Sequence, residues 1–369
     1  MSFAKLSIRQ PKETFKTMSE CAFQSIEHLK SGLSLSSRSG CPLDCAYCLL
    51  HAGDSNGKRV SVLDAPDTLV ARLMRPETLF LNGKTPLFLN NRTDPFLPEV
   101  VPDTFRMLHL LAKNAVRSPV VLVSKFFPPD ELVEYCEKLS LMFIYSYSAI
   151  EDDFNFNDIS RIREITRTFP AGHLFHYLRP IIPGRNDNMT SLRKVLLLFS
   201  DAGFSGSILS GIRVTRGNLA YLNGTAEEIS AHKFFSPRVY QTLLEDPAIS
   251  NRHYALFRHT SCAIDFFMKR ANRLGYFLRE GHCNPKCKNR ENCEAAPCFS
   301  HPELRKCISD RFPNMKFALG TDGVAIQTPV SQEVTAFLKN AYGIRVTAEH
   351  LLLSPSEEVL SDASATNRL

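Results

Sequence analysis

The chain has 369 residues, of which 44% are hydrophobic and 22% are charged, with a formal net charge of +6. This length predicts one large α/β domain of about 200–250 residues with an appended unit, and the mild charge permits a polyanionic partner without requiring one. The longest apolar stretch, residues 139–150, is too short to span a bilayer and the N-terminus lacks the apolar run of a secretory signal, so we expect a cytoplasmic protein with no membrane partner.

From residue 32 to residue 214, apolar runs alternate with amphipathic stretches. The runs are apolar at consecutive positions, which is typical of parallel strands buried on both faces. They predict strands at 33–36, 86–90, 119–124, 141–148, 173–178 and 207–214. The segments between them predict helices at 64–74, 101–113, 129–139, 158–168 and 190–202. Repeated strand–helix units of roughly thirty residues indicate βαβ connections and a parallel sheet, either open or curled.

The alternation ends after Val214. Residues 216–258 are polar and predict a helical or irregular connection, and residues 260–278 predict an amphipathic helix. Residues 316–350 predict two short strands, a helix at 331–341 and a strand at 343–346. The expected organisation is an N-terminal segment at 1–30, an α/β unit at 31–215, a helical connection and cysteine-rich region at 216–310, a small α/β element at 311–353 and a polar tail at 354–369.

Eleven cysteines are a high count, and most of them gather in two groups. Nothing in the sequence indicates export, so the close spacing favours metal or cluster ligation over disulfides. The first group, Cys41, Cys45 and Cys48, lies on the loop after the first predicted strand. Three thiolates can hold one face of a [4Fe–4S] cluster and leave one iron open, because no fourth cysteine is near. The alternatives are a zinc site, with His51 as the nearest further ligand, or three unligated thiols.

The spacing CxxxCxΦC, with Tyr47 at the aromatic position Φ, resembles that of the radical S-adenosylmethionine (SAM) superfamily. The resemblance implies a partial (β/α)6 TIM-like barrel, here with a C-terminal cysteine-rich extension, and an active site at the C-terminal ends of the strands. It also implies that the open iron chelates the amino and carboxylate groups of SAM. An electron from the cluster, which a donor such as flavodoxin or ferredoxin would reduce, then cleaves a C–S bond of SAM and gives a 5′-deoxyadenosyl radical that abstracts a hydrogen atom.

The second predicted strand ends in LFLNNRTDPFLPE. This segment resembles the TDP-type motif of the spore photoproduct lyase-like branch and departs from the Gly-rich motif usual in the superfamily. The resemblance makes Asn90, Thr93 and Asp94 candidates for binding the methionine amine of SAM. Asn, Asp and Pro are also ordinary turn formers, and a plain turn is the alternative.

The later strands carry further candidates by the same resemblance. Ser146 and Ser148 lie two positions apart and share one face of a buried strand, where ribose hydroxyls, the SAM carboxylate or a neighbouring backbone group would satisfy them. Arg179 precedes the branch-like PIIPGRND ending and is a candidate for the SAM carboxylate or for a structural salt bridge. Ile212 and Val214 resemble the apolar contacts made to adenine, although core packing explains them equally well.

The second group, Cys283, Cys287, Cys293 and Cys298, can saturate one metal or cluster. Its spacing does not match a zinc ribbon of paired CxxC units, so we favour an auxiliary [4Fe–4S] cluster, as several radical SAM families carry after the barrel. Zinc is the alternative, with His282 or His301 as substitutes, and free thiols are a third reading. Cys262 or Cys307 could replace one assumed ligand. Cys21 and Cys136 are expected to be ordinary buried thiols.

These patterns predict a radical SAM enzyme of open subclass, with no catalytic residues assigned beyond the cluster ligands. A nucleic acid or nucleotide is the first expected substrate, although the second cysteine group departs from the single-cluster plan of spore photoproduct lyase. A peptide- or protein-modifying radical SAM enzyme is the alternative. A further alternative is a non-catalytic zinc or iron–sulfur protein that binds nucleic acid through basic residues near the second group, namely Lys269, Arg270, Arg273, Arg279, Lys286, Lys288 and Arg290.

Overall fold

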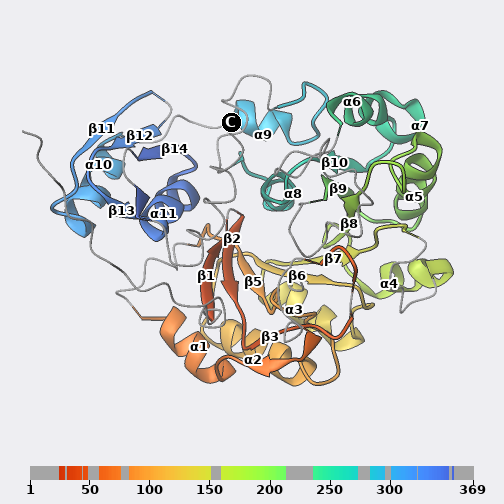
Figure 1. Ribbon diagram of the computed structural model, residues 1–369, viewed down its shortest axis with the longest axis horizontal. Helices are drawn as coiled ribbons and strands as arrows, with labels where there is room; N and C mark the ends of the chain where they lie inside the picture. The colour runs from red at the N-terminus through yellow and green to blue at the C-terminus, as the bar shows by residue number, and fades with distance from the viewer. Residues whose placement is uncertain are drawn as a thin grey trace, which may run out of the picture.

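The computed structural model describes residues 25–29, 31–43, 45–48, 58–75, 83–150, 159–212, 236–272, 283–295, 301–321, 323–348 and 351–352. Its centre is an eight-stranded sheet in the order β1-β2-β5-β6-β7-β8-β9-β10 (Figure 1). Every neighbouring pair from β2 to β10 is parallel, and β1 (Ile26–Leu29) pairs antiparallel with β2 (Gly32–Leu35) at one edge. The carboxyl ends of the parallel strands therefore meet at one side of the sheet.

The six strands expected from the apolar runs are confirmed. After β2 they are β5 (Leu87–Leu89), β6 (Val120–Ser124), β7 (Leu141–Ser146), β8 (Leu174–Ile181) and β9 (Gly206–Gly211). A seventh parallel strand, β10 (Ala255–Phe257), pairs with β9 and falls in the segment where only a helical or irregular connection was expected. Three residues are too short to show a strand pattern, so β10 could not be read from the sequence.

The helices between the strands also follow the expected order. They are α1 (Pro66–Leu73), α2 (Val101–Lys113), α3 (Val133–Lys138), α4 (Ile162–Thr168) and α5 (Met189–Asp201), followed by α6 (Pro237–Glu245) and α7 (Pro247–Ser250). All seven contribute buried side chains to one continuous apolar cluster with one face of the sheet. Figure 1 shows α1, α2 and α3 along the outside of β2 to β6. This helix-covered face is the outer face of the sheet.

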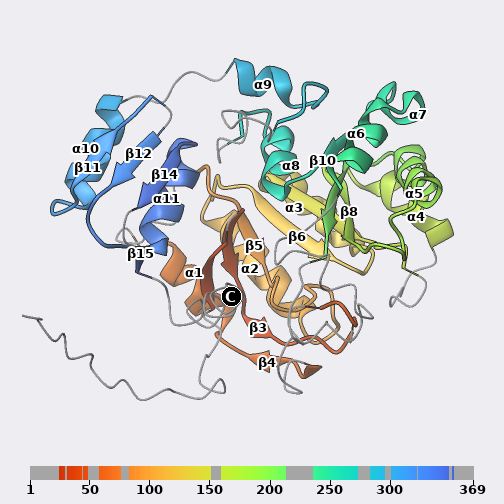
Figure 2. The same cartoon turned by 45° about the horizontal axis from the view of Figure 1, so that its top comes forward.

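The opposite, inner face is covered in its amino-terminal half by α8 (Thr260–Phe267). Ala263 and Ile264 of this helix pack against apolar side chains from six strands, represented by Phe88, Val121, Ile144, Phe175, Ile208 and Phe257. Figure 2 shows α8 lying over the sheet on the side away from α2. The inner face thus has an apolar base.

Helix α8 is shorter than the helix expected at 260–278. Lys269 has φ +50°, and the N–H of Arg270 donates to the carbonyl of Asp265 at 2.9 Å. The N–H of Lys269 donates to the carbonyl of Phe266, also at 2.9 Å. This pair of reversed hydrogen bonds around a left-handed residue is a Schellman ending, which stops the helix although its apolar pattern continues.

The C-terminal unit has a core of its own. A three-stranded sheet of β11 (Phe317–Leu319), β12 (Gly323–Ile326) and β14 (Arg345–Ala348) packs with α10 (His301–Arg311) and α11 (Gln332–Tyr342), and β13 (Val330–Ser331) pairs with β15 (Leu351–Leu352). The helix expected at 331–341 is confirmed, whereas α10 was not anticipated. Figures 1 and 2 both place this unit at the β1 edge of the main sheet, opposite α5 to α7. No helix within the described ranges is long and apolar enough to cross a membrane.

Candidate active site at the carboxyl ends of the strands

The first cysteine group lies on the loop that leaves β2 through the short strand β3 (Arg38–Ser39), which pairs with β4 (Ser61–Val62). We call residues 41–48 the cysteine loop; Asp44 lies outside the described residues. Cys41 is buried, whereas Cys45 and Cys48 are half-buried. The N–H of Cys48 donates to the carbonyl of Cys45 at 2.9 Å and forms a turn between them.

The three thiols of the cysteine loop lie close enough to influence one another. The pKa of Cys41 is raised to about 12, mainly by burial and to a smaller extent by the charges of Asp94, Cys48 and Cys45. Among the described residues, no three His, Cys, Asp or Glu side chains converge as tightly as a single metal ion requires. The cysteine loop nevertheless provides three thiols on one short segment, and thiolates are the usual ligands of an iron–sulfur cluster.

Asp94 fastens the loop after β5 to the end of β6. Its carboxylate is buried and accepts hydrogen bonds from the N–H of Phe96 at 3.0 Å, the hydroxyl of Ser124 at 2.7 Å and the N–H of Lys125 at 2.8 Å. Burial raises the pKa of this carboxyl, and the same three hydrogen bonds oppose that rise. Asp94 therefore uses its acceptor capacity inside the protein, next to Cys41.

Thr93 differs from its neighbour in this respect. The residue is 8% exposed, and its Oγ1 has no hydrogen-bond partner among the described residues. A buried hydroxyl normally has a partner, because leaving it unsatisfied costs about 1–3 kcal/mol. The unsatisfied hydroxyl at the strand ends, beside the cysteine loop, fits a polar ligand at this position.

Asn90 connects the cysteine loop to the end of β5. It is fully buried with φ +50°, a left-handed conformation that asparagine tolerates. Its Oδ1 lies 3.0 Å from both the N–H and the hydroxyl of Ser37, and its Nδ2 donates to Thr104 Oγ1 at 2.8 Å. Gly40 adds a backbone bond from its N–H to the carbonyl of Arg92 at 3.0 Å. Asn90 thus positions the chain that leads into the cysteine loop.

Tyr47 packs the cysteine loop against residues that follow β7, β8 and β9. Its ring packs with Ile150, Ile182 and Ile212, which follow β7, β8 and β9. The Nζ of Lys125 lies 5.5 Å from the centre of the same ring. The loop that starts at β2 therefore reaches the carboxyl ends of β7 to β9. Val214, the second residue suggested for an adenine contact, lies outside the described residues.

The inner face becomes polar toward the carboxyl ends of the strands. Ser146 follows Met142 and Ile144 on the inner side of β7, and Ser148 continues the same alternation. Arg179 likewise follows Phe175 and Tyr177 on β8. Further polar residues lie at this level that were not predicted from the sequence, namely Ser34, Ser36, Asn91, Lys125 and Ser210. The alternating serines in LSLSS are a signal for the first two of them. We call this set, with Ser146, Ser148 and Arg179, the polar layer.

Hydrogen bonds within the polar layer fix several of its members. The hydroxyl of Ser34 donates to Asn91 Oδ1, and that of Ser36 lies 3.5 Å from the same atom. Arg179 donates to the hydroxyl of Tyr177 at 3.0 Å and lies over its ring at 5.4 Å. Within the described part of the chain Arg179 forms no ion pair with a carboxylate, so the salt bridge weighed for it is not seen there.

The PIIPGRND segment organises the ends of β7 and β8 through Asn186. This buried side chain donates to the carbonyls of Ser148 at 2.6 Å and Pro180 at 2.9 Å, and accepts from the N–H of Ile182 at 2.7 Å. The hydroxyl of Ser148 accepts from the N–H of Ile150 at 3.4 Å. Asn186 therefore holds the wall against which Tyr47 packs.

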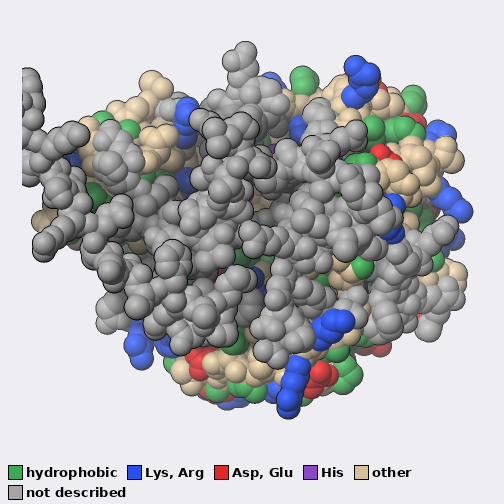
Figure 3. Space-filling view, in the orientation of Figure 1, with side chains coloured by type: hydrophobic (Ala, Val, Ile, Leu, Met, Phe, Trp, Pro, Cys, Tyr) green, Lys and Arg blue, Asp and Glu red, His purple; other side chains and the backbone are tan. Residues whose placement is uncertain are grey.

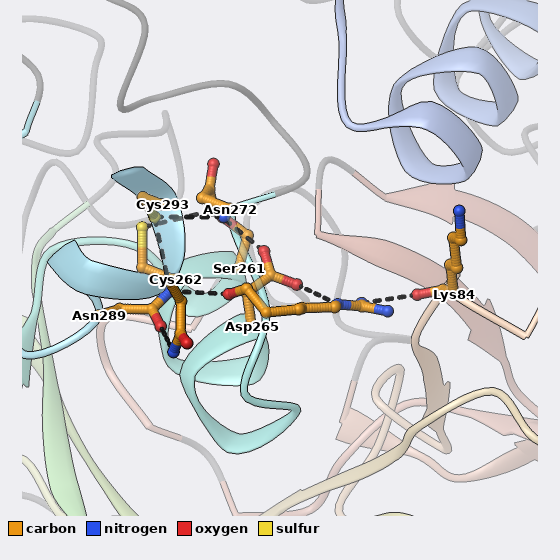
Figure 4. A network of polar contacts seen from close by, with 9 residues as sticks. Lys84, Ser261, Cys262, Asp265, Asn272, Asn289 and Cys293 are labelled. Atoms are coloured by element: carbon orange, nitrogen blue, oxygen red, sulfur yellow. Dashed lines mark hydrogen bonds and ion pairs between the residues drawn. The ribbon is translucent and has the colours of Figure 1, made fainter. Parts of the chain in front are cut away.

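The second cysteine group comes together with a residue of α8. Cys283, Cys287 and Cys293 are described, whereas Cys298 and His282 are not. Burial raises the pKa of Cys262 well above its ordinary value, and the charges of Cys287, Cys293 and Cys283 add to the rise. Figure 4 shows Cys262 close to Cys293, with Asn272 hydrogen-bonded to both sulfurs.

The remaining cysteines lie elsewhere. Cys307, on α10, packs against the core of the C-terminal unit. His301 begins the same helix. Cys136 is buried among the apolar residues of the outer face, which confirms the expectation for it. Cys21 and His51 lie outside the described residues.

Two of the basic residues near the second group are engaged in ion pairs. Arg270 pairs with the buried Asp265 at 2.8 Å and donates to the carbonyl of Lys84 at 2.7 Å, and Arg290 pairs with Glu294 at 2.6 Å. Arg273 and Arg279 are not described. In Figure 3 the coloured Lys and Arg side chains are scattered around the rim of the face shown.

The comparisons with known proteins found similarity in solved structures only: no family model matches the chain, and no curated protein matches it. A spore photoproduct lyase variant with bound AdoMet and dinucleoside spore photoproduct is similar at 14% identity and a TM-score of 0.43, over 56% of this chain and 64% of that chain. A second lyase structure, complexed with dinucleoside spore photoproduct, is similar at 14% identity and a TM-score of 0.38, over 54% and 61%. The chain thus spans less than two thirds of the lyase chains that it matches.

Proposed function

We propose that this chain is a radical SAM enzyme with a partial (β/α)6 barrel, which reductively cleaves SAM at a [4Fe–4S] cluster and abstracts a hydrogen atom from a nucleic-acid or nucleotide substrate. The observation that carries the proposal is one juxtaposition. Three thiols of the cysteine loop, an unsatisfied buried hydroxyl and the polar layer all lie at the carboxyl ends of parallel strands. Ligands bind at this end of parallel α/β sheets.

The cysteine loop would hold the cluster through Cys41, Cys45 and Cys48. When bound, such a cluster supplies one electron to SAM and an open iron that chelates its amino and carboxylate groups. The apolar contacts of Cys41 and Cys45 with Leu97 and Val100 keep water from the side of the site that faces α2. Asn90 holds the start of the loop in place through Ser37.

Polar side chains around the loop would hold SAM itself. Of the three residues suggested for the methionine amine, Asn90 and Asp94 use their polar atoms in internal hydrogen bonds, so Thr93 is the one with an unsatisfied group. Ser146, Ser148 and Arg179 would contact the ribose or carboxylate from the polar layer. Tyr47, with Ile212 against its ring, would border the adenine.

The substrate assignment depends on the TDP-type segment at Thr93 and Asp94 and its likeness to the spore photoproduct lyase-like branch. A second candidate function is modification of a peptide or protein, and the second cysteine group favours it because auxiliary clusters also accompany that chemistry. The non-catalytic nucleic-acid binder is less well supported, because Arg270 and Arg290 of its basic surface are engaged in ion pairs.

Anaerobic incubation of reconstituted protein with SAM and dithionite tests the proposal, with 5′-deoxyadenosine followed by mass spectrometry. The wild-type chain should form 5′-deoxyadenosine, and Cys45→Ala should form none. Cys136→Ala is the matched control, because Cys136 is buried in α3 among outer-face residues. Product formation by Cys45→Ala at the wild-type rate would refute the assignment. Stimulation by an oligonucleotide but not by a peptide decides the substrate class, and flavodoxin or ferredoxin in place of dithionite tests the electron donor.

A further inference from the structure

Helix α8 brings one thiol to the second cysteine group from a distant part of the sequence. Asn272 lies between Cys262 of α8 and Cys293, as Figure 4 shows. Its backbone N–H donates to Cys293 Sγ at 3.4 Å, and its side-chain Nδ2 donates to Cys262 Sγ at 3.5 Å. The sulfurs of Cys262 and Cys293 therefore both accept a hydrogen bond from Asn272.

The other two thiols approach from the turn before α9 (Arg290–Glu294). The N–H of Cys287 donates to the carbonyl of Asn284 at 3.0 Å, which folds the chain back between Cys283 and Cys287. The guanidinium of Arg290 lies 4.0 Å from Cys283 Sγ. The N–H of Arg290 donates to the carbonyl of Cys287 at 3.0 Å, so Cys283, Cys287 and Cys293 lie on one short folded segment.

The groups around these sulfurs are hydrogen-bond donors. Besides the two N–H groups of Asn272 and the guanidinium of Arg290, the side-chain Nδ2 of Asn289 lies 3.7 Å from Cys293 Sγ. The buried carboxylate nearby, Asp265, pairs with Arg270 at 2.8 Å and accepts from Asn272 Nδ2 at 3.1 Å. Donors directed at thiolate sulfur stabilise its negative charge, and they also tune iron–sulfur clusters.

We propose that an iron–sulfur cluster binds here and that its ligands are Cys262, Cys283, Cys287 and Cys293, so that Cys298 is not one of them. Four thiolates saturate a [4Fe–4S] cluster and leave no open iron, unlike the three of the cysteine loop. The site does not depend on the SAM chemistry proposed above, because none of these residues belongs to the cysteine loop.

The position of Cys262 sets where this cluster lies. Cys262 packs against the apolar base of the inner face, two residues after the start of α8. Thr260, at that start, shares a hydrogen bond of 2.9 Å with Tyr177, whose hydroxyl also accepts from Arg179 of the polar layer. The second site therefore borders the inner face of the sheet, and Thr260, two residues before Cys262 in the chain, is connected to Arg179 of the polar layer through Tyr177.

Removing the first cluster isolates the second in the experiment. In a Cys41→Ala/Cys45→Ala/Cys48→Ala background, reconstituted protein should retain roughly four iron and four sulfide per chain, with the Mössbauer spectrum of one [4Fe–4S] cluster. Adding Cys262→Ser should remove most of this iron. Adding Cys298→Ser, or Cys136→Ser as the matched buried control, should leave it unchanged. These readouts are independent of SAM cleavage, so they separate failure of this site from failure of the proposed function.

Full iron retention by Cys262→Ser, loss of iron on Cys298→Ser, or stoichiometric zinc in place of iron would each overturn the proposal. A second measurement uses no substitution at Cys262, so misfolding of the Cys262→Ser variant cannot account for its result. Iodoacetamide labelling of the same background, with and without an iron chelator, should show Cys283 and Cys287 protected by iron and Cys298 labelled equally in both. Iron-dependent protection of Cys298 would contradict the ligand set.

Discussion

The Oδ1 atom of Asn90 lies 3.0 Å from both the backbone N–H and the hydroxyl of Ser37, and this pair joins the end of β5 to the entry of the cysteine loop. Asn90→Ala removes these bonds and the one to Thr104, and it places alanine at φ +50°. We expect a loss of about 2–4 kcal/mol in the free energy of unfolding and a lower iron content at the first site. Urea unfolding and iron analysis measure the two effects. Asn114→Ala, at an exposed position on the C-terminal cap of α2, should change stability by less than about 0.5 kcal/mol.

Thr93→Val tests the unsatisfied hydroxyl. Because Thr93 Oγ1 bonds to no described residue, valine should leave the stability of the free protein unchanged or slightly raised. The Kd for SAM should rise roughly 3–10-fold, the equivalent of one lost hydrogen bond of about 0.5–1.5 kcal/mol. Calorimetric titration of the reconstituted protein measures it, with the exposed Thr242→Val as control. A fall in stability without a change in Kd would assign Thr93 to the fold alone.

His176 predicts a pH dependence of stability. It is fully buried, stacks on Phe199 at 3.6 Å, and its ring nitrogens lie 2.7 Å from Ser207 Oγ and 2.9 Å from the carbonyl of Tyr147. Burial lowers its pKa to about 3, and the bond to the Tyr147 carbonyl opposes this. Because the unfolded chain takes up the proton first, the stability contributed by neutral His176 is fully present above about pH 6.5 and is lost as the pH falls toward 3.

The matching experiment compares slopes between pH 6.5 and pH 5. His28, whose pKa burial lowers to about 4, acts in the same direction. His176→Gln should reduce the slope of unfolding free energy by up to about 1.4 kcal/mol per pH unit, and His109→Gln, at an exposed position, serves as the control. An unchanged slope in His176→Gln would mean that folding does not lower the pKa of this imidazole.

Asn272→Ala tests the donors around the second cluster. The variant removes the side-chain bond to Cys262 and keeps the backbone bond to Cys293. Fewer donors to the sulfurs stabilise the more negative, reduced cluster less, so the reduction potential should fall. A redox titration followed by electron paramagnetic resonance measures the shift, and the exposed Asn314→Ala serves as control. A reduction potential equal to that of the wild type would mean that the side chain of Asn272 does not donate to a cluster ligand.

Gly206→Ala tests the strand that the sequence did not reveal. A Cβ at Gly206 would overlap the carbonyl oxygen of Ala255 in β10. We expect a loss of about 1–3 kcal/mol in unfolding free energy. Gly184→Ala, at φ +74° with open space around it, should cost only about 1 kcal/mol from backbone strain. Equal effects in the two variants would indicate that β10 does not pair with β9 in solution.

The parallel sheet was predictable because each of its long strands is apolar on both faces and the cysteine loop follows the first of them. The Schellman ending of α8 was not predictable, because it uses a lysine where glycine is usual and the apolar pattern continues past it. Thr93 appears in a turn-forming motif, but only the structure shows that its hydroxyl is unsatisfied. The approach of Cys262 to Cys293 depends on how α8 packs, since the two residues belong to different segments of the chain.

Helix α8 also determines where water can lie against the inner face of the sheet. Its Ala263 and Ile264 lie against aromatic and aliphatic side chains, so hydration from the amino-terminal side would find few hydrogen-bonding partners among the described residues. Above that level Arg179 and Ser146 offer polar contacts. Water is therefore expected at the polar layer and not at the apolar base. A ligand bound at the polar layer would displace this water, and the apolar base beneath it would remain free of water.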